Sequence, residues 1–304
     1  MRSALSIISA LKRRRRHAGK VEIALEEVKI AQGVILSELN KAKTSRRLQD
    51  FEFKVFSQWG EDGSSQRLVG VVPIKNKTFI EFGIEDFSES NCRFLMMKDN
   101  WSGFVIDGSE SNIAELKRSY YFPQYDLEAV SAFVTRENID EYLRASGVSD
   151  DLGILSIDLD GNDFHILNAI HSVTPRILIC EYNAIFGPSR KITVPYDKSF
   201  RRTQKHHSNL YYGASLAAIA ELAARKGYLL VGTNSAGNNS FFVREDLMSE
   251  QLEALTVDEA FTLSKFREAR DVDGKLTYLS GNKRSDLIRS LPVINVATNQ
   301  EEEV

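Results

Sequence analysis

The region between residues 51 and 245 alternates apolar runs with amphipathic segments, and this alternation restricts the fold more than any other feature. It is typical of an α/β protein in which a mostly parallel sheet is built from strands joined by crossover helices. Asn234 to Asn239 is rich in turn residues and predicts a hairpin-like return, so we expect an antiparallel last strand. The predicted strands are 78–82, 103–106, 128–133, 153–157, 176–180, 228–233 and 240–243. The predicted helices are 90–99, 111–119, 137–145, 163–170 and 214–226.

The chain divides into three segments. A length of 304 residues suits one large domain with extensions, and a composition of 42% hydrophobic and 27% charged residues is that of an ordinary globular protein. We expect a catalytic core over 51–245, a basic and heptad-like helical extension over 1–50, and a helical C-terminal extension with an acidic tail over 246–304.

The first 20 residues carry seven basic side chains and no acidic one, and an apolar stretch precedes the basic cluster. Such a segment can lie on an anionic membrane surface or bind a polyanion, and a solvated terminus is the alternative. We therefore predict a peripheral membrane or polyanion contact through residues 1–20.

A short heptad pattern follows between residues 21 and 39. Apolar residues and one glutamine recur at alternating spacings of four and three, which is the spacing of a helix that packs along one seam. The helix either packs on its own domain or forms a homo-oligomer with other copies. The pattern consists of Val21, Leu25, Val28, Gln32, Ile35 and Leu39.

Cysteine usage and hydropathy predict the compartment. Cys92 and Cys180 have no metal-ligand or redox spacing, which favours a reducing environment. No run approaches the roughly 18 apolar residues of a membrane span, and the apolar start of the chain is short and precedes its basic cluster. We expect a cytoplasmic protein. Binding of the basic segment 1–20 to lipid would place it peripherally at the inner face of the membrane. The net charge of -3 gives no electrostatic reason to expect nucleic acid as a partner.

Polar residues after the first predicted strand suggest a cofactor site, because ligands of open α/β sheets bind at the carboxyl ends of strands. Gly83 lets backbone approach a ligand, and the helix that starts near Asn91 offers free N–H groups. A full G-x-G-x-x-G is absent, and acids such as Glu81 would repel a pyrophosphate. These surroundings suit the positively charged adenosyl sulfonium of S-adenosylmethionine.

Asp107 ends the second predicted strand 24 residues after Gly83 and is followed by Ser109. An acid about 20 residues beyond a glycine turn is well placed to accept hydrogen bonds from both ribose hydroxyls. The alternative is a helix cap, the usual role of an acid at this place. We expect adenine contacts near Ser131 and Ala132.

Carboxyl and amide groups follow the fourth and fifth predicted strands. Asp158, Asp160 and His165 come after the fourth strand, and Glu181 and Asn183 come after the fifth. Hard divalent cations such as Mg²⁺ prefer oxygen ligands of this kind, and such an ion can lower the pKa of a substrate hydroxyl. Without metal, one of the two aspartates or the histidine would be the general base. The structural alternatives are a helix cap at Asp163 and a core-facing His165.

Several segments in this order resemble the FkbM-like branch of class I S-adenosylmethionine-dependent methyltransferases, especially members found among polysaccharide-assembly enzymes. The resemblance covers about residues 51–244. One departure is the glycine-poor loop after the first strand, which weakens the cofactor motif. The matching segments are 57–63 (SQWGEDG), 79–83 (FIEFG), 89–91 (ESN), 105–109 (VIDGS), 155–163 (LSIDLDGND), 180–183 (CEYN), 194–197 (VPYD), 211–215 (YYGAS) and 237–239 (GNN).

The resemblance implies a seven-stranded doubly wound sheet and O-methylation of a hydroxyl on a sugar or polyketide. It implies donor contacts from Glu81, Gly83 and Asp107 and a lid or wall beside the donor. Some related enzymes bind magnesium on acids at the ends of the fourth and fifth strands. The resemblance implies that the matching residues here are Asp158 or Asp160, together with Glu181 and Asn183. The predicted donor-binding residues are Gln58, Glu61, Asp62, Glu81, Gly83, Asn91, Asp107 and Ser109, of which the first three form the wall.

The long segment 186–212 is rich in basic and aromatic side chains. Arginines clamp carboxylates or phosphates and tyrosines stack on sugar faces, so the segment fits an anionic glycan acceptor, with a mobile solvated loop as the alternative. The predicted substrate residues are Tyr196, Arg201, Arg202, His206, His207 and Tyr212.

We therefore expect an S-adenosylmethionine-dependent O-methyltransferase that acts on a saccharide or glycan, for example in bacterial surface polysaccharide biosynthesis. A metal-dependent hydrolase that uses Asp158, Asp160 and Glu181 is the second hypothesis. A non-catalytic scaffold with a methyltransferase fold is the third.

Overall fold

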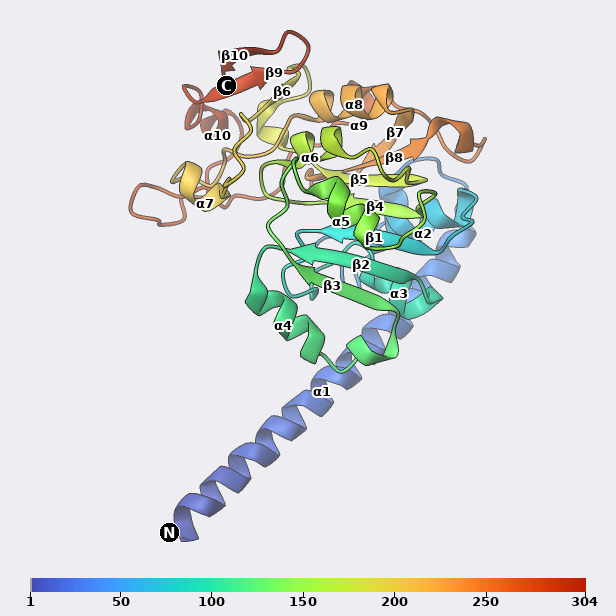
Figure 1. Cartoon of the computed structure of the whole chain (residues 1–304), viewed down its shortest axis with the longest axis vertical. Helices are drawn as coiled ribbons and strands as arrows, with labels where there is room; N and C mark the ends of the chain where they lie inside the picture. The colour runs from blue at the N-terminus through green and yellow to red at the C-terminus, as the bar shows by residue number, and fades with distance from the viewer. Residues whose placement is uncertain (1) are drawn as a thin grey trace.

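A seven-stranded sheet forms the centre of the computed structural model, which describes residues 2–304 and their side chains from residue 19 onward (Figure 1). The strand order is β3-β2-β1-β4-β5-β8-β7, and β8 alone runs antiparallel to its neighbours. Strand order reverses between β1 and β4, which makes the sheet doubly wound and places the ligand-binding crevice there. The strands are β1 (Thr78–Phe82), β2 (Ser102–Asp107), β3 (Leu127–Ser131), β4 (Ile154–Ile157), β5 (Ile177–Glu181), β7 (Tyr228–Thr233) and β8 (Asn239–Arg244).

The α/β fold predicted from the alternation is confirmed, including the antiparallel last strand. Each predicted strand and helix of the core is present with its bounds shifted by a few residues at most. The helices that pack on the sheet are α2 (Glu61–Val71), α3 (Arg93–Asp99), α4 (Glu110–Arg118), α5 (Ile139–Ala145), α6 (Asp163–Ala169) and α8 (Leu216–Arg225).

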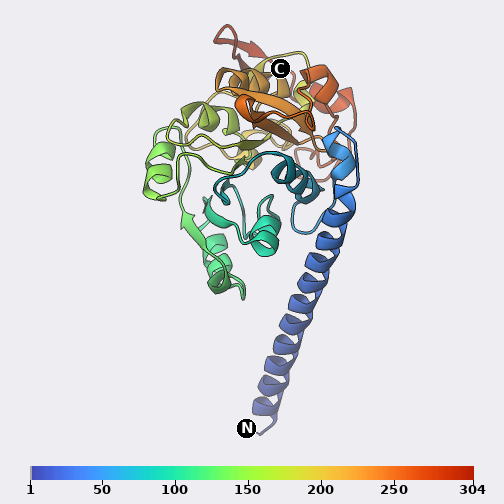
Figure 2. The ribbon, with the colours of Figure 1, turned by 90° about the vertical axis from the view of Figure 1, so that its right-hand side faces the viewer.

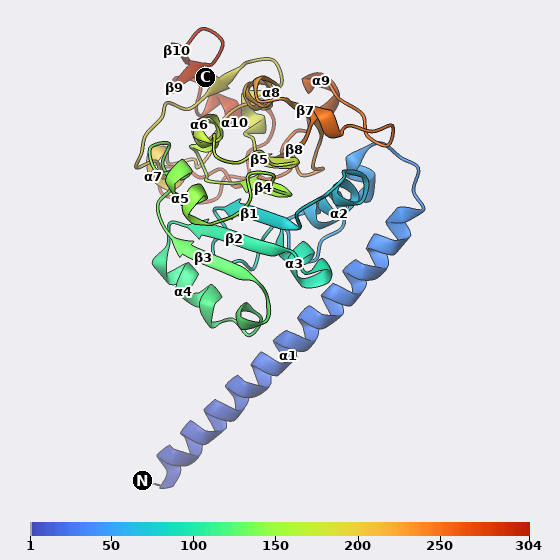
Figure 3. The same cartoon turned by 45° about the vertical axis from the view of Figure 1, so that its right-hand side comes forward.

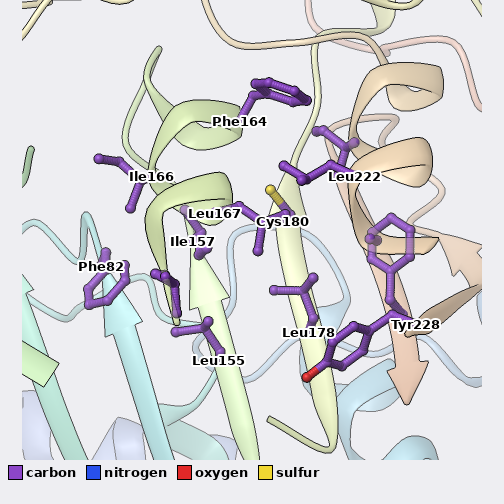
Figure 4. Close-up of a cluster of buried hydrophobic side chains, with 14 of the residues drawn as sticks. Phe82, Leu155, Ile157, Phe164, Ile166, Leu167, Leu178, Cys180, Leu222 and Tyr228 are labelled. Atoms are coloured by element: carbon purple, nitrogen blue, oxygen red, sulfur yellow. The ribbon is translucent and has the colours of Figure 1, made fainter. Parts of the chain in front are cut away.

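Alternating strand side chains build two cores, one on each face of the sheet. Ile80 and Phe82 point into the core covered by α5, α6 and α8, whereas Phe79 points into the core covered by α2, α3 and α4. Figure 4 shows the first core, where Cys180 of β5 lies among side chains of α6 and α8. Cys180 and Cys92 are both buried and form no disulfide, as expected for small apolar side chains.

The C-terminal segment differs from its prediction as a helical extension. Helix is confined to α9 (Val257–Ala260) and α10 (Asn282–Asp286), and the acidic tail is a strand. β9 (Pro292–Asn295) pairs with both β10 (Gln300–Glu303) and β6 (Ile192–Thr193) in a small second sheet. β6 belongs to the long segment 186–212, which also holds α7 (Arg202–Lys205). The tail is extended because β10 pairs with β9 just before it, and β9 in turn pairs with β6 about 100 residues earlier. Local periodicity does not reveal that second pairing.

Short 3₁₀ turns connect several of these elements. They are η1 (Leu48–Phe51), η2 (Phe122–Gln124), η3 (Ala184–Phe186) and η4 (Glu245–Leu247). Asn183 caps η3, because its side chain accepts a hydrogen bond from the Ile185 N–H at 3.0 Å.

One long helix, α1 (Arg2–Lys41), precedes the core. Its C-terminal half lies against α2 and α3, and its N-terminal half projects away from the domain (Figure 2 and Figure 3). Its 40 residues correspond to about 60 Å at 1.5 Å per residue. The predicted helix over 21–39 is confirmed, and it continues without a break from the basic segment. The membrane contact predicted for residues 1–20 involves almost only residues whose side chains the structure does not describe. Within the described part of the chain, no helix has the length and apolarity needed to cross a bilayer.

Candidate functional site

A pocket of about 850 Å³ opens at the carboxyl ends of β1, β2, β4 and β5, where the strand order reverses. This volume is in the range of small-molecule and cofactor sites. Two arginines, Arg201 and Arg202, lie among many more acidic residues in its wall. The carboxyl side chains that line the pocket are Glu81, Glu85, Glu89, Asp107, Asp158, Asp160, Glu181 and Glu268.

Glu81 anchors the loop that follows β1. The hydroxyl of Ser90 donates to its carboxyl group at 2.6 Å, and the Asn91 N–H donates at 2.7 Å. Burial raises the pKa of Glu81 to about 7. Asn91 in turn donates from its amide to Ser156 Oγ at 3.1 Å, so the loop after β1 is tied to β4. Glu81 and Asn91 both line the pocket.

Gly83 allows the loops after β1 and β4 to touch. Its φ of 73° favours glycine, and a Cβ at this position would lie 1.5 Å from the carbonyl oxygen of Asp158. The sequence predicted that Gly83 admits a ligand close to the backbone. The structure adds a second requirement, because the neighbouring loop fills the place where a side chain would be.

Asp107 lines the pocket at the end of β2 and does not act as the cap of α4. Its carboxylate accepts from the Glu85 N–H at 2.9 Å and from the Ser109 N–H at 2.7 Å. Ser109 is the cap, because its hydroxyl accepts from the Asn112 N–H at 3.3 Å. A carboxylate has about four acceptor sites, so Asp107 keeps capacity for ligand hydroxyls.

Beyond β3 the pocket wall is formed by Ala132, Phe133 and Val134. Ala132 lies in the region where we expected adenine contacts, whereas Ser131 is not part of the lining. Phe133 is 39% exposed and offers a ring face toward the pocket region, with the Arg201 guanidinium 5.5 Å from its centroid. The sequence did not single out Phe133, because an aromatic residue next to a strand is usually a core residue.

The predicted wall residues have different roles. Gln58 lines the pocket, but Glu61 and Asp62 do not. Glu61 is buried and accepts from Asn234 and Asn239 at 2.5 and 3.0 Å, which ties α2 to the turn between β7 and β8. Asp62 accepts from the N–H groups of residues 55–57 at 2.7 to 2.8 Å. Both acids hold the loop that carries Gln58 and do not face the pocket.

Three carboxyl groups meet at the ends of β4 and β5. Oxygens of Asp158, Asp163 and Glu181 lie within 4.8 Å of one another. Burial, followed by the charge of neighbouring aspartates, raises the pKa of both Asp158 and Glu181 well above the ordinary range. Asp158 and Glu181 line the pocket. They therefore hold a proton at pH values where an exposed carboxyl has lost it.

Asp163 is the member of this group that the sequence placed only as a helix cap. Its carboxylate accepts from the N–H groups of Leu159 and Gly161 at 2.7 and 3.0 Å. Burial raises its pKa to about 6. The side chain closes the loop between β4 and α6, which is the loop that carries Asp158.

The predicted set of metal ligands is not assembled as a group. Asp160 accepts from Arg202 Nη1 at 2.8 Å at the exposed rim of the pocket. The Asn183 side chain donates to the Leu210 and Tyr212 carbonyls at 2.9 and 3.0 Å, and its oxygen caps η3. Of the four predicted metal ligands, only Asp158 and Glu181 lie close to each other. With Asp163 they offer three carboxylates to one cation, although both oxygens of Asp163 already accept backbone hydrogen bonds.

His165 points away from the pocket. Its Nε2 lies 2.8 Å from the carbonyl oxygen of Val194, and its ring packs edge-on against Phe164 and Tyr196. A carbonyl only accepts, so Nε2 carries the proton and donates it. Burial also lowers the pKa of His165. His165 is absent from the pocket lining and packs against the segment 186–212, so this arrangement gives no support to its predicted role as the base.

The long segment 186–212 lines the pocket, but largely with other residues than those predicted. Its lining residues are Phe200, Arg201, Arg202, Thr203, Gln204 and Asn209. Arg201 and Arg202 line the pocket, whereas Tyr196, His206, His207 and Tyr212 do not. Arg202 is already engaged by Asp160 and by the Asn209 carbonyl at 2.8 Å, and it stacks 3.8 Å from the Tyr212 ring centroid. It is therefore not free to clamp an anionic substrate.

Other pocket residues lie outside the sequence predictions. Asn239 of β8 pairs with Glu181 of β5 in the sheet register and lines the pocket. Glu181 Oε2 and Asn239 Oδ1 are buried and have no hydrogen-bond partner among the described residues. Glu268 comes from the C-terminal segment, which sequence resemblance did not cover. Only the pairing of β5 with β8 and the folding back of the C-terminal segment bring these side chains to the pocket.

No protein-family model matches this sequence, and no curated protein matches it. Solved structures similar to the chain include the N-terminal domain of EvdMO1 with SAH bound, at 12% identity and a TM-score of 0.40, over 62% of this chain and 81% of that one. PKMT2 from Rickettsia typhi in complex with AdoHcy has 10% identity and a TM-score of 0.39, over 64% of this chain and 54% of that one. The pyocyanin biosynthetic protein PhzM has 10% identity and a TM-score of 0.35, over 59% of this chain and 53% of that one. Function has to be argued from the site itself.

Proposed function

We propose that the protein is an S-adenosylmethionine-dependent O-methyltransferase whose acceptor is a neutral, polyhydroxylated molecule such as a saccharide. One observation carries the proposal. The pocket joins an acid suited to ribose, Asp107, to a pair of carboxyl groups with raised pKa values, the half-buried Asp158 and the buried Glu181.

The ends of β1, β2 and β3 form the donor half of the pocket. Asp107 offers acceptor capacity to the two ribose hydroxyls, and Phe133 offers an aromatic face to adenine. The acidic surroundings from Glu81 and Glu85 favour a ligand with a sulfonium and an ammonium group and disfavour a pyrophosphate. A nucleotide with two phosphates fits this lining poorly.

The ends of β4, β5 and β8 form the acceptor half. The acceptor oxygen attacks the methyl carbon of the sulfonium, and the C–S bond breaks with its electron pair passing to sulfur. The hydroxyl proton passes to the carboxylate of the Asp158 and Glu181 pair, which later releases it to water. The products are a methyl ether and S-adenosylhomocysteine. Positioning supplies most of the rate, because the donor is already activated.

A polyhydroxylated acceptor is favoured by the unpartnered atoms of the acceptor half. Glu181 Oε2 and Asn239 Oδ1 are buried acceptors on paired strands, and burial without a partner is costly. Neighbouring hydroxyls of a sugar would donate to both. The excess of carboxylates and the engagement of Arg202 by Asp160 argue for a neutral acceptor instead of the anionic one suggested by the arginines. A role in bacterial surface glycan assembly, and a place in the FkbM-like branch, belong to the same proposal.

Calorimetry with S-adenosylhomocysteine and turnover of labelled donor test the proposal together. We expect binding of S-adenosylhomocysteine, and methyl transfer to a member of a panel of free, nucleotide-linked and lipid-linked sugars. Glu181→Gln should lower turnover by about 10² to 10⁴-fold with donor binding kept, because the base is removed. Glu141→Gln, an exposed acid on α5, is the matched control and should change neither value.

The other outcomes separate the remaining hypotheses. Folded protein that does not bind S-adenosylhomocysteine would contradict a methyltransferase and favour a hydrolase. Binding without turnover on any extracted glycan would favour a scaffold. The cluster of three carboxylates, Asp158, Asp163 and Glu181, favours a second version of the reaction in which a divalent cation orients the acceptor hydroxyl. Loss of turnover with a chelator and recovery with Mg²⁺ would support that version.

A further inference from the structure

Helix α1 has two opposite faces with different surroundings. One face packs on the protein's own domain, where Arg93 donates to Glu26 at 2.9 Å and Asn40 donates to the Phe51 carbonyl at 2.7 Å. Gly33 lies on this face, and a Cβ there would come within 2.4 Å of Val55 and 2.7 Å of Phe94. The helix is therefore fixed on the domain through this face, with no room for a larger side chain.

The other face carries the heptad stripe, and it is open. All five apolar residues of the stripe are between 46% and 63% exposed. In a heptad with Leu25 and Leu39 at position a and Ile35 at position d, the residues that contact the domain lie mainly at positions b and f. They are Glu26, Gly33 and Asn40 at b, Ile30 and Ser37 at f, and Leu36 at the neighbouring e position. In a coiled coil, a and d face the partner helices while b and f face outward. The domain thus occupies the outward side and leaves the seam free. The exposed stripe residues are Val21, Leu25, Val28, Ile35 and Leu39.

We propose that this stripe binds the same stripe of other copies of the chain in a parallel, in-register coiled coil. The polar residue of the stripe, Gln32, is exposed at an a position. A parallel, in-register pairing sets Gln32 against Gln32 of another copy, where each amide can donate and accept. One polar a residue selects a register in this way. Leucine at a with β-branched residues at d favours three or four helices over two.

The charges around the stripe argue against a lipid surface as the occupant. From residue 19 to 41 the helix has three lysines and four glutamates, so this part has no excess of positive charge. A helix that lies on an anionic membrane carries basic residues on its polar face and a broad apolar face. The stripe instead is limited to a and d positions, which is the narrow seam of a coiled coil.

The oligomer would leave the pocket accessible. In Figure 1, β1, β2 and β3 point toward the side of α4 and α7, whereas the C-terminal half of α1 lies on the opposite side of the sheet. Each copy would keep its own pocket open, since the seam and the pocket are on different sides of the domain. The inference stands independently of the proposed function.

Sedimentation velocity of the full chain over a range of concentrations tests the proposal. We expect a mass of three or four chains. Leu25→Gln with Ile35→Gln should shift the protein to monomer, with melting temperature of the domain unchanged because both residues are exposed. The matched control is Lys20→Gln with Glu27→Gln, two exposed c positions on the same helix, which should keep the oligomer.

Cross-linking tests the orientation. Oxidised Gln32→Cys should form disulfide-linked chains, and Glu27→Cys should not, with little background because Cys92 and Cys180 are buried. A wild-type monomer at all concentrations, or an unchanged mass in the seam variant, would overturn the proposal. Failure of Gln32→Cys to cross-link would overturn the parallel register, and a dimer mass would overturn the number of copies. Seam-dependent binding of a monomer to phosphatidylglycerol vesicles would assign the stripe to lipid instead.

Discussion

Gly83 and Asp158 join the two halves of the pocket, because the backbone of Gly83 is in close contact with the carbonyl group of Asp158. A Cβ on Gly83 would lie 1.5 Å from that carbonyl oxygen. The loop after β1 carries donor-side groups, and the loop after β4 carries the proposed base. Their close approach fixes the distance between donor and acceptor, on which an in-line methyl transfer depends.

Gly83→Ala should destabilise the domain by more than about 2 kcal/mol, since the added atom forces the two backbones apart at a positive φ. Urea unfolding monitored by circular dichroism measures this. Gly70→Ala is the control, because a Cβ at that helical position meets nothing within 4 Å and should stabilise by about 0.5 to 1 kcal/mol. Equal stability of the two variants would contradict the role of Gly83.

Asp107→Asn should weaken S-adenosylhomocysteine binding by about ten- to a hundredfold. The ribose hydroxyls would lose a charged acceptor, and such hydrogen bonds contribute roughly 1.5 to 3 kcal/mol. Isothermal titration calorimetry measures the affinity. Glu110→Gln removes a nearby exposed acid of α4 that does not line the pocket and should bind as the wild type does. Unchanged affinity of Asp107→Asn would remove Asp107 from the donor site.

Turnover should rise with pH through a range above that of ordinary carboxyl groups. The base acts when deprotonated, and burial raises the pKa of both Asp158 and Glu181. The positive charge of Arg202 lowers both pKa values, so Arg202→Gln should move the rising limb to higher pH. Rate profiles of wild type, Arg202→Gln and Arg202→Lys measure the shift, and the lysine variant should restore most of it. A profile that stays in place in Arg202→Gln would argue against this pair as the base.

The free energy of unfolding should fall between about pH 5 and pH 7 as pH rises. Burial raises the pKa of Glu81 from 4.5 to about 7, so the folded state binds a proton that the unfolded state has released. The added stability is full below the unfolded pKa and is lost as pH passes the folded pKa. Each such group changes the free energy of unfolding by at most about 1.4 kcal/mol per pH unit.

Glu81→Gln should flatten this dependence without abolishing it, because Asp62 and Asp163, both with pKa raised to about 6, act in the same direction. Urea unfolding at several pH values gives the slopes. An equally steep decline in Glu81→Gln would show that Glu81 titrates normally in the folded protein.

Much of the core was predictable from local patterns. Apolar periodicity gave β1 and α8 nearly to the residue, because each buries one set of side chains against a neighbour. The same applies to the residues that directly follow strands. Gly83 and Asp107 line the pocket as expected, since the ends of neighbouring parallel strands must meet at one edge of the sheet.

The direction of side chains in the loops was not predictable. Asp158, Asp160 and Asp163 lie within six residues of one another, yet each faces a different environment. Asp158 faces the pocket, Asp160 binds Arg202, and Asp163 accepts hydrogen bonds from the backbone of its own loop. A positive φ of 53° at Asp160 turns the chain there. The Asp160-Gly161 dipeptide indicates a turn, but it does not specify which way each carboxylate faces. His165 faces Val194 because the distant segment 186–212 packs over α6.

The sequence by itself determined the order of strands and helices, the glycine and acid after β1 and β2, and the heptad stripe of α1, because all of these follow from spacing along a regular element. Only the tertiary structure decided which face of α1 is covered. Either the heptad stripe or the face around Gly33 could have packed on the domain, and the domain packs on the face around Gly33. The tertiary structure also decided the acceptor half of the pocket. Glu181, Asn239 and Glu268 are brought together by antiparallel pairing and by the return of the C-terminal segment, contacts between residues far apart in the chain.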